Sequence, residues 1–120
     1  GTLYLIWRKP YMTIGKDTFI HSMLESMGLK NMFAHQTRYP IIHNFQTSYF
    51  SNCKLVLLSS EPYPLTEKHI REIQQQLPHV KIVLVYGEYF SWYGSKIKDA
   101  PAYFTSLLKQ INEQNAASGV

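Results

Sequence analysis

The sequence predicts an α/β domain, a three-layer sandwich in which a small, mostly parallel sheet is flanked by helices. Two continuous apolar runs, KLVLLS at 54–59 and KIVLVYG at 81–87, are typical of strands that are covered on both faces. The segment between them, 66–78, carries apolar residues at helical spacing and ends near Pro78. A strand, a helix and a second strand in this order are expected to form the right-handed crossover of a parallel sheet.

Length and composition indicate one globular domain over residues 1–120. Hydrophobic residues make up 45% of the chain and charged residues 17%, which argues against disorder. No apolar run approaches the ~18 residues that span a bilayer. The net charge of +4 is spread along the chain without a basic block, so we expect no nucleic-acid partner. Gly1 directly precedes a strand-like segment, so we expect a chain cut from a longer protein or a tag remnant.

The N-terminal half is expected to contain one strand and one helix, followed by a less regular region. Residues 3–8, LYLIWR, are rich in strand formers and precede the strand breaker Pro10. A helix over 17–28 is expected to begin at the N-cap residue Asp17 and to stop at Gly28. The remaining predictions for this half are a short strand, a loop and a short helix, over residues 31–34, 37–44 and 45–52.

The C-terminal half alternates strands and helices more clearly. The helix over 66–78 carries one inward stripe, formed by Ile70, Ile73 and Leu77. A further helix is predicted over 99–114, with Asp99 as its cap and Pro101 in the first turn. Its inward residues are expected to be Phe104, Leu107, Leu108 and Ile111. The tail, 115–120, is expected to be frayed.

Motifs for phosphate binding and covalent catalysis do not occur in the sequence. The loop TIGKD after the first strand has one glycine, and there is no GxSxG motif. Cys53, the one cysteine, precedes a strand, where a small buried residue is expected. The histidines are far apart, so we expect them on the surface or on a helix face and expect no resident metal or cofactor; His35 or His43 alone would not hold a bare ion.

Aromatic residues follow the ends of the predicted strands. The loops after the strands read RKPYMTIGKD, SSEPYP and YGEYFSWYGS, and RYP lies in the middle loop. In parallel α/β sheets, ligands meet the loops at the carboxyl ends of the strands. A single ring at such a place often caps the core with its polar tip in water. The concentration of rings on one edge predicts a platform for a large flat or apolar ligand.

The ordered segments WRKPYMTIGKDTFIHSMLESMGLKNMFA, RYP, KLVLLSSEPYP and KIVLVYGEYFSWYGS lie within residues 2–111. Together they resemble the C-terminal lobe of helical-backbone periplasmic substrate-binding proteins of ABC importers, the class that includes receptors for cobalamin, haem and ferric siderophores. The resemblance implies a two-lobed receptor with a ligand cleft between the lobes. This chain would supply the C-terminal lobe, and the N-terminal lobe, the linking helix and the export signal would lie outside it.

The resemblance also implies a location and a partner. Such a receptor is periplasmic or lipid-anchored in the cell envelope, catalyses no reaction, and delivers its ligand to an ABC-transporter permease in the inner membrane. The expected ligand is a metal-containing macrocycle or chelate, with cobalamin first and ferric siderophore or haem next.

Within this class the pattern is most similar to the cobalamin-binding member. That similarity implies ring contacts from Tyr11 and Tyr39, an aromatic contact near Met12, and hydrogen bonds from ligand amides to Glu88. Trp92 stands where the cobalamin receptor has an arginine, so the ligand itself is left open. The residues expected to contact or orient the ligand are Tyr11, Met12, Arg38, Tyr39, Tyr63, Glu88, Tyr89, Phe90 and Trp92.

Receptors of this class usually pair one acidic residue on each lobe with arginines of the permease. In this lobe the position follows the proline of RYP by a few residues, close to Phe45, and no carboxylate lies nearby in the sequence. Docking would then use another residue, with Glu61 and Glu67 as candidates, or the partner differs.

Two alternatives stay open from the sequence. A small intracellular α/β enzyme could use Glu61 and Glu88 as acid and base at the same edge. The chain could also be a stand-alone interaction domain whose aromatic edge is buried against a partner. A signal peptide and a first lobe upstream would favour the receptor over the enzyme, and sizing the protein with and without ligand would distinguish the interaction domain.

Overall fold

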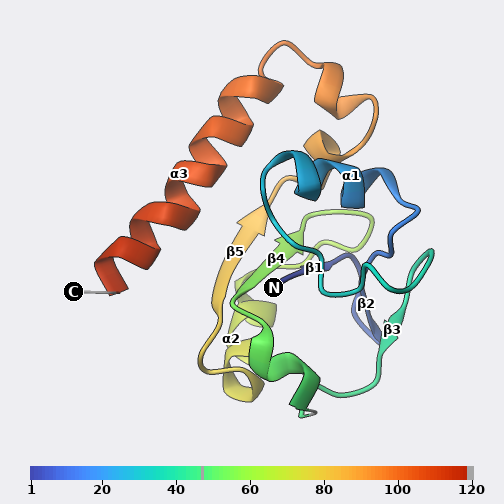
Figure 1. The fold of residues 1–120 in the computed structure, drawn as a ribbon, viewed down its shortest axis with the longest axis vertical. Helices are drawn as coiled ribbons and strands as arrows, with labels where there is room; N and C mark the ends of the chain where they lie inside the picture. Colours follow the sequence, from blue (N-terminus) through green and yellow to red (C-terminus); the bar gives the residue numbers. More distant parts are fainter. Residues whose placement is uncertain (47, 119–120) are drawn as a thin grey trace.

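The computed structural model describes residues 1–46 and 48–118, with side chains described up to residue 112. Its main element is a three-stranded parallel sheet in the order β1-β4-β5, formed by Thr2–Leu5, Leu55–Ser59 and Lys81–Val85 (Figure 1). The connections between successive strands of this sheet contain helices. The predicted α/β class with a small parallel sheet is therefore confirmed.

Strand β4 lies at the centre of this sheet, and all of its residues are buried. Leu57, in its middle, is fully buried and pairs with Tyr4 on β1 and Val83 on β5. A central strand covered on both faces has no solvent-facing side, which explains why its sequence is a continuous apolar run rather than an alternating one.

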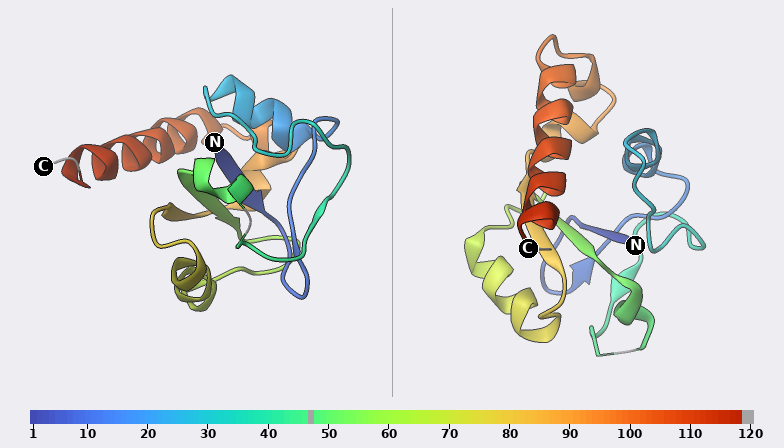
Figure 2. Two further views of the ribbon diagram at one scale, coloured as in Figure 1. Left: turned by 60° about the horizontal axis from the view of Figure 1, so that its bottom comes forward. Right: turned by 60° about the vertical axis from the view of Figure 1, so that its left-hand side comes forward.

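Helices cover both faces of the sheet, as the left view of Figure 2 shows. The helices are α1, α2 and α3, over Phe19–Ser26, Glu67–Gln76 and Ala100–Ser118. Ile73 of α2 belongs to a buried cluster with Leu3 and Val56 on one face, whereas Leu24 of α1 and Leu107 of α3 join the cluster on the other. Among the described residues, no helix combines the length and the apolar character needed to cross a bilayer.

A second sheet, two-stranded and antiparallel, lies partly where the sequence predicts a loop. Strand β2, Tyr11–Met12, pairs with β3, Ile41–Ile42, so the loop prediction over 37–44 is wrong for the two isoleucines. Each strand has only two residues, which is too short for an alternating pattern to be visible. A bridge between Trp7 and Met12 joins this ribbon to the chain that leaves β1.

Helix α1 begins one residue later than the predicted cap implies. Thr18 is the N-cap, and its Oγ1 accepts a hydrogen bond from the His21 N–H at 3.1 Å. Asp17, the predicted cap, instead accepts the Arg38 N–H at 2.5 Å. Asp and Thr are both good N-cap residues. Here Asp17 is hydrogen-bonded to the Arg38 backbone instead, a contact between distant residues that the local sequence pattern does not reveal.

Three further segments differ in part from expectation. The strand predicted over 31–34 is reduced to one parallel bridge between Asn31 and Thr2. The short helix predicted over 45–52 is present as a 3₁₀ helix, Ser48–Asn52. Helix α3 continues to Ser118, beyond its predicted end, and the last two residues of the tail that was expected to fray lie outside the described residues.

The centre of the sheet is expected to carry much of the stability. Leu57→Ala should lower the free energy of unfolding by about 2–5 kcal/mol, because Leu57 is fully buried and its removal leaves a cavity. Leu84→Ala is the matched control, since Leu84 lies on β5 and is 41% exposed. Urea unfolding followed by circular dichroism measures both variants, and equal losses would contradict the central role of β4.

Candidate functional site

The loops that follow β1, β4 and β5 are tied together at the carboxyl end of the sheet. The Gly87 N–H donates to Ser60 Oγ at 3.0 Å, which joins the loops after β4 and β5. The Tyr63 N–H donates to the Ile6 carbonyl at 3.4 Å, which joins the loops after β4 and β1. Segments from three parts of the sequence thus meet at one end of the sheet, where binding sites of parallel α/β folds form.

The aromatic segment 86–95 contains two short 3₁₀ helices, η2 over Gly87–Phe90 and η3 over Gly94–Lys96. Phe90 is only 1% exposed, and its ring lies 5.0 Å from Tyr4 and 5.3 Å from Phe104. Trp92, two residues later, is 64% exposed. One ring therefore anchors the segment in the core, and the next presents a large apolar surface to solvent.

Gly94 allows the two short helices to lie against each other. A Cβ at this position would lie 1.6 Å from the Glu88 carbonyl oxygen, which no side chain could tolerate. The Ser91 hydroxyl also links the two short helices, because it donates to the Glu88 carbonyl at 2.7 Å and accepts a hydrogen bond from the Gly94 N–H at 3.0 Å. The turn that carries Trp92 outward is therefore held from both sides.

The Trp92 patch consists of Phe19, Trp92, Tyr93, Lys96 and Ile97. The Phe19 ring, from α1, meets the indole edge-on at a centroid distance of 5.9 Å. Lys96 Nζ lies 4.4 Å from the centroid of the Trp92 ring, a cation–π contact. Tyr93 and Ile97 are 86% and 43% exposed. Sequence reasoning missed the parts played by Phe19 and Lys96, although the four-residue spacing from Trp92 to Lys96 was a visible signal.

Tyr39 is exposed on a loop that runs beside the segment following β2. The Gly15 N–H donates to the Arg38 carbonyl at 2.8 Å, and the Thr13 N–H donates to the Pro40 carbonyl at 3.0 Å. Arg38 has a left-handed backbone, with φ of 60°, and its side chain is exposed. These contacts hold the loop so that the Tyr39 ring, 54% exposed, faces solvent.

Trp7 and Tyr63 form a second ring pair near the end of β1. Their centroids are 5.4 Å apart in an edge-to-face arrangement, and Trp7 is 38% exposed while Tyr63 is half-buried. Trp7 is absent from the residues predicted at the ligand. Trp7 lies in the strand-forming run 3–8, and such a position does not indicate an exposed ring.

Tyr11 lies in the core and not on the exposed aromatic surface. Its hydroxyl donates to Glu72 Oε1 at 2.7 Å, and Arg8 Nε donates to the same oxygen at 2.6 Å. The Arg8 guanidinium also lies 4.7 Å from the Tyr11 ring centroid, and Phe45 covers the ring edge-on. Tyr11 is therefore a buried packing residue, and its ring is covered by Arg8 and Phe45.

The other predicted contact residues divide between core and surface. Met12 is half-buried, Phe90 is buried, and Tyr89 is half-buried and stacks on Tyr103 at 4.3 Å. Glu88 is exposed in the first turn of η2. Among the described residues, the Trp92 ring contacts Phe19, and neither of these rings contacts Tyr39. The exposed predicted residues are Arg38, Tyr39, Glu88 and Trp92.

The acidic residues considered for docking or catalysis are all on the surface. Glu61, Glu67 and Glu88 are exposed, and Glu61 lies close to Gly87, so it and Glu88 occupy adjacent loops. Exposed carboxylates at this edge can accept hydrogen bonds from a ligand or pair with cations. Across residues 1–46 and 48–118, no group of three or more His, Cys, Asp and Glu side chains is arranged to hold a metal ion.

Cys53, just before the central strand β4, is fully buried, as the sequence predicts. Burial raises the pKa of its thiol to about 11, because the charged thiolate loses solvation. A thiol in this state is a poor nucleophile at neutral pH. The structure thus gives Cys53 a packing role.

The Arg8–Glu72–Tyr11 contacts predict a pH dependence of stability. Burial alone raises the pKa of the Glu72 carboxyl, but the hydrogen bonds from Tyr11 and Arg8 and the Arg8 charge outweigh it, so the folded pKa lies below the ordinary value. A lowered folded pKa stabilises the protein above the unfolded pKa, and this contribution is lost as the pH falls through the folded value.

Glu72→Gln should therefore lower stability at pH 7 by about 1 kcal/mol and remove part of the loss that the original protein shows below about pH 4.5. Urea unfolding at a series of pH values measures both effects. Glu67→Gln, an exposed residue of the same helix, is the control. An unchanged acid slope in Glu72→Gln would show that these hydrogen bonds do not govern the acid limb.

The Cys53 thiol should react very slowly with Ellman's reagent at pH 8 in the folded protein. Its burial excludes the reagent, and its pKa of about 11 keeps the thiolate fraction small. In guanidinium chloride the same thiol should react at the rate of a free cysteine. Equal rates in the two conditions would mean that Cys53 is open to solvent.

Comparisons with known proteins do not identify a family for this chain. No protein-family model matches the sequence, and no curated protein is significantly similar to it. What the chain does is therefore argued from its residues, its fold and the exposed aromatic surface.

Proposed function

We propose that this chain is the C-terminal lobe of a substrate-binding protein of an ABC importer. The observation that supports the proposal best is the exposed Trp92 patch, in which a 64% exposed indole is held by Phe19 and Lys96 beside the carboxyl end of a parallel sheet. Large exposed apolar patches usually mark binding surfaces, because water disfavours them. The ordered motifs that resemble this receptor class add to the same interpretation.

The proposed ligand is a metal-containing macrocycle or chelate, with cobalamin first and a ferric siderophore or haem next. Trp92 and Tyr39 offer exposed rings of the kind that stack on flat or apolar groups. Arg38 and Glu88, both exposed, would orient polar groups at the ligand's edge. No bond is made or broken by the lobe in this proposal.

The buried rings have a supporting part in the proposed site. Phe90 fixes the segment that carries Trp92, and Tyr11, a residue of β2, helps to hold the ribbon of β2 and β3 in place. Tyr89 is largely used in stacking on Tyr103. We therefore assign ligand contact to the exposed residues and positioning to the buried ones.

In this proposal a second lobe supplies the opposite wall of the cleft, and the receptor acts in the periplasm or anchored to the cell envelope. The loaded receptor docks on an inner-membrane permease. Glu61 and Glu67 are exposed carboxylates on the side of β4 and α2, and either is available to pair with a basic residue of the permease. Such charge pairs act mainly on register and rate of encounter.

A binding titration tests the proposal. The two-lobed receptor is titrated with cyanocobalamin, haemin and a panel of ferric siderophores, followed by absorbance or calorimetry. One of them is expected to bind with Kd below about 10 μM, which corresponds to about −7 kcal/mol. Failure of all of them to reach this affinity would reject the ligand assignment.

Trp92→Ala and Tyr39→Ala should each weaken the ligand that binds by about 1 kcal/mol or more. Tyr86→Ala is the matched control, because Tyr86 is 61% exposed but lines a groove between β5 and α3. Equal effects of all three substitutions would show that the Trp92 patch and Tyr39 have no special part in binding.

A further inference from the structure

The outer edge of β5 is open along its middle. The Lys81 N–H donates to the Lys54 carbonyl and the Ser60 N–H donates to the Val85 carbonyl, so the backbone groups of Lys81, Val83 and Val85 face β4. Backbone direction alternates along a strand, so those of Ile82 and Leu84 face away from the sheet. Within the described part of the chain, no backbone hydrogen bond reaches the N–H of Ile82 or Leu84 from this side.

Helix α3 is attached to β5 at both ends of this open stretch. The Tyr86 N–H, just after the strand, donates to the Tyr103 hydroxyl at 2.8 Å. Lys81 Nζ, at the start of the strand, donates to the Gln110 carbonyl at 2.9 Å and also to the Ile111 carbonyl. Helix α3 is therefore bonded to the two ends of β5 and, over its described residues, makes no backbone hydrogen bond to Ile82 or Leu84 between them.

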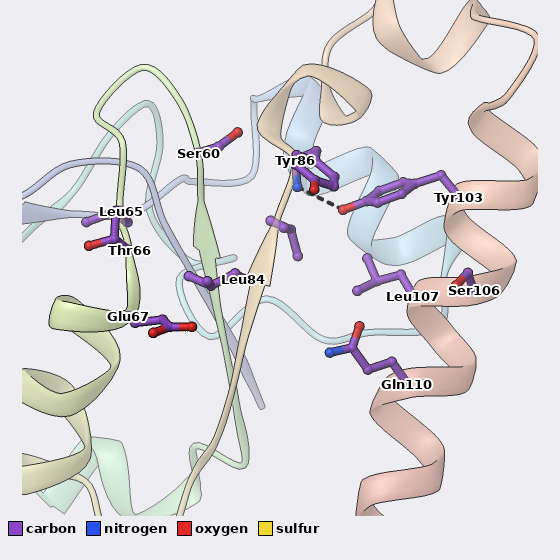
Figure 3. A pocket seen from close by; sticks show the side chains of 11 residues that line it. Ser60, Leu65, Thr66, Glu67, Leu84, Tyr86, Tyr103, Ser106, Leu107 and Gln110 are labelled. Atoms are coloured by element: carbon purple, nitrogen blue, oxygen red, sulfur yellow. Dashed lines mark hydrogen bonds between the residues drawn. The ribbon is translucent and has the colours of Figure 1, made fainter.

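A groove of about 600 Å³ lies along this edge, between α3 on one side and the start of α2 on the other (Figure 3). Apolar side chains line much of it, including Leu65, Leu84 and Leu107, and Leu84 is 41% exposed. Exposed strand edges in natural proteins are usually protected by a charge, a proline or a bulge. The one lysine of β5, Lys81, is already bonded to α3, so the middle of the edge has no such protection.

We propose that this groove binds an extended peptide segment of a partner protein, which adds to the sheet as a fourth strand beside β5. The carbonyl and N–H groups of Ile82 and Leu84 recur at the two-residue spacing of a strand, and only another extended backbone matches that spacing along its length. The segment carries apolar side chains at alternate positions, which pack against Leu84 and Leu107. The proposal is independent of the ligand site at Trp92.

A single strand suits this edge better than a second copy of the chain. Because α3 stands beside β5 and is bonded to it through Tyr86 and Lys81, two copies joined edge to edge would each bring an α3 to the same place. A peptide has no such bulk. Glu67 lines the groove at the start of α2 and favours a basic residue near one end of the peptide.

Amide exchange of the 15N-labelled chain tests the proposal. The probe is a heptapeptide of alternating threonine and valine between terminal lysines, blocked at both ends. At about 1 mM probe, exchange of the Ile82 and Leu84 amides should slow by about tenfold or more, while the Val83 amide, already paired with β4, changes little. The control peptide is N-methylated at every internal residue, so it keeps the side chains and the charge, but it cannot donate hydrogen bonds to the Ile82 and Leu84 carbonyls, and its methyl groups obstruct a strand beside β5.

Leu84→Lys should abolish the protection, because a charge on a strand edge opposes pairing. Ile41→Lys is its matched control, since Ile41 is 46% exposed on β3, in the other sheet, and should leave the protection intact. Equal protection by the N-methylated peptide, or equal effects of the two lysines, would overturn the proposal. So would protection of Ile82 and Leu84 that rises with protein concentration in the absence of peptide, which would assign the edge to a second copy.

Discussion

The parallel pairing of β4 with β1 on one side and β5 on the other is the constraint on which the rest of the structure depends. Leu57 pairs with Tyr4 and Val83 at the middle of this sheet, and helices bury both of its faces. Because the strands run in the same direction, the chain leaves all of them at one end. The loops that carry Trp7, Tyr63 and Trp92 are brought together for this reason, with no motif of their own that specifies it.

Core and surface are built from the same short segment after β5. Phe90 packs against Tyr4 in the interior, and Trp92 projects into solvent two residues later. The close contact between Gly94 and the Glu88 carbonyl makes this reversal possible. A binding surface that is held in place before the ligand arrives loses little conformational entropy when the ligand binds. The proposed receptor function would benefit from this arrangement.

The two exposed features of the chain lie on different elements and differ in chemistry. The Trp92 patch offers ring faces and a cation to a small ligand, whereas the edge of β5 offers backbone groups to another chain. The Arg8–Glu72–Tyr11 contacts belong to neither the Trp92 patch nor the edge of β5. They join the segment after β1 to α2.

Much of the fold could be predicted from the sequence because its signals are local. The apolar runs at 54–59 and 81–87 and the stripe of Ile70, Ile73 and Leu77 reflect burial that each element imposes on its own residues. The sequence by itself thus determined the α/β class, the parallel crossover and the concentration of aromatic residues after the strands. Only the tertiary structure decided which rings are exposed, because that depends on distant partners: Phe45 covers the Tyr11 ring, Phe90 packs against Tyr4, and Phe19 contacts Trp92 at the surface. The two-residue strands β2 and β3 were decided in the same way, since their stability comes from each other and not from any pattern within either segment.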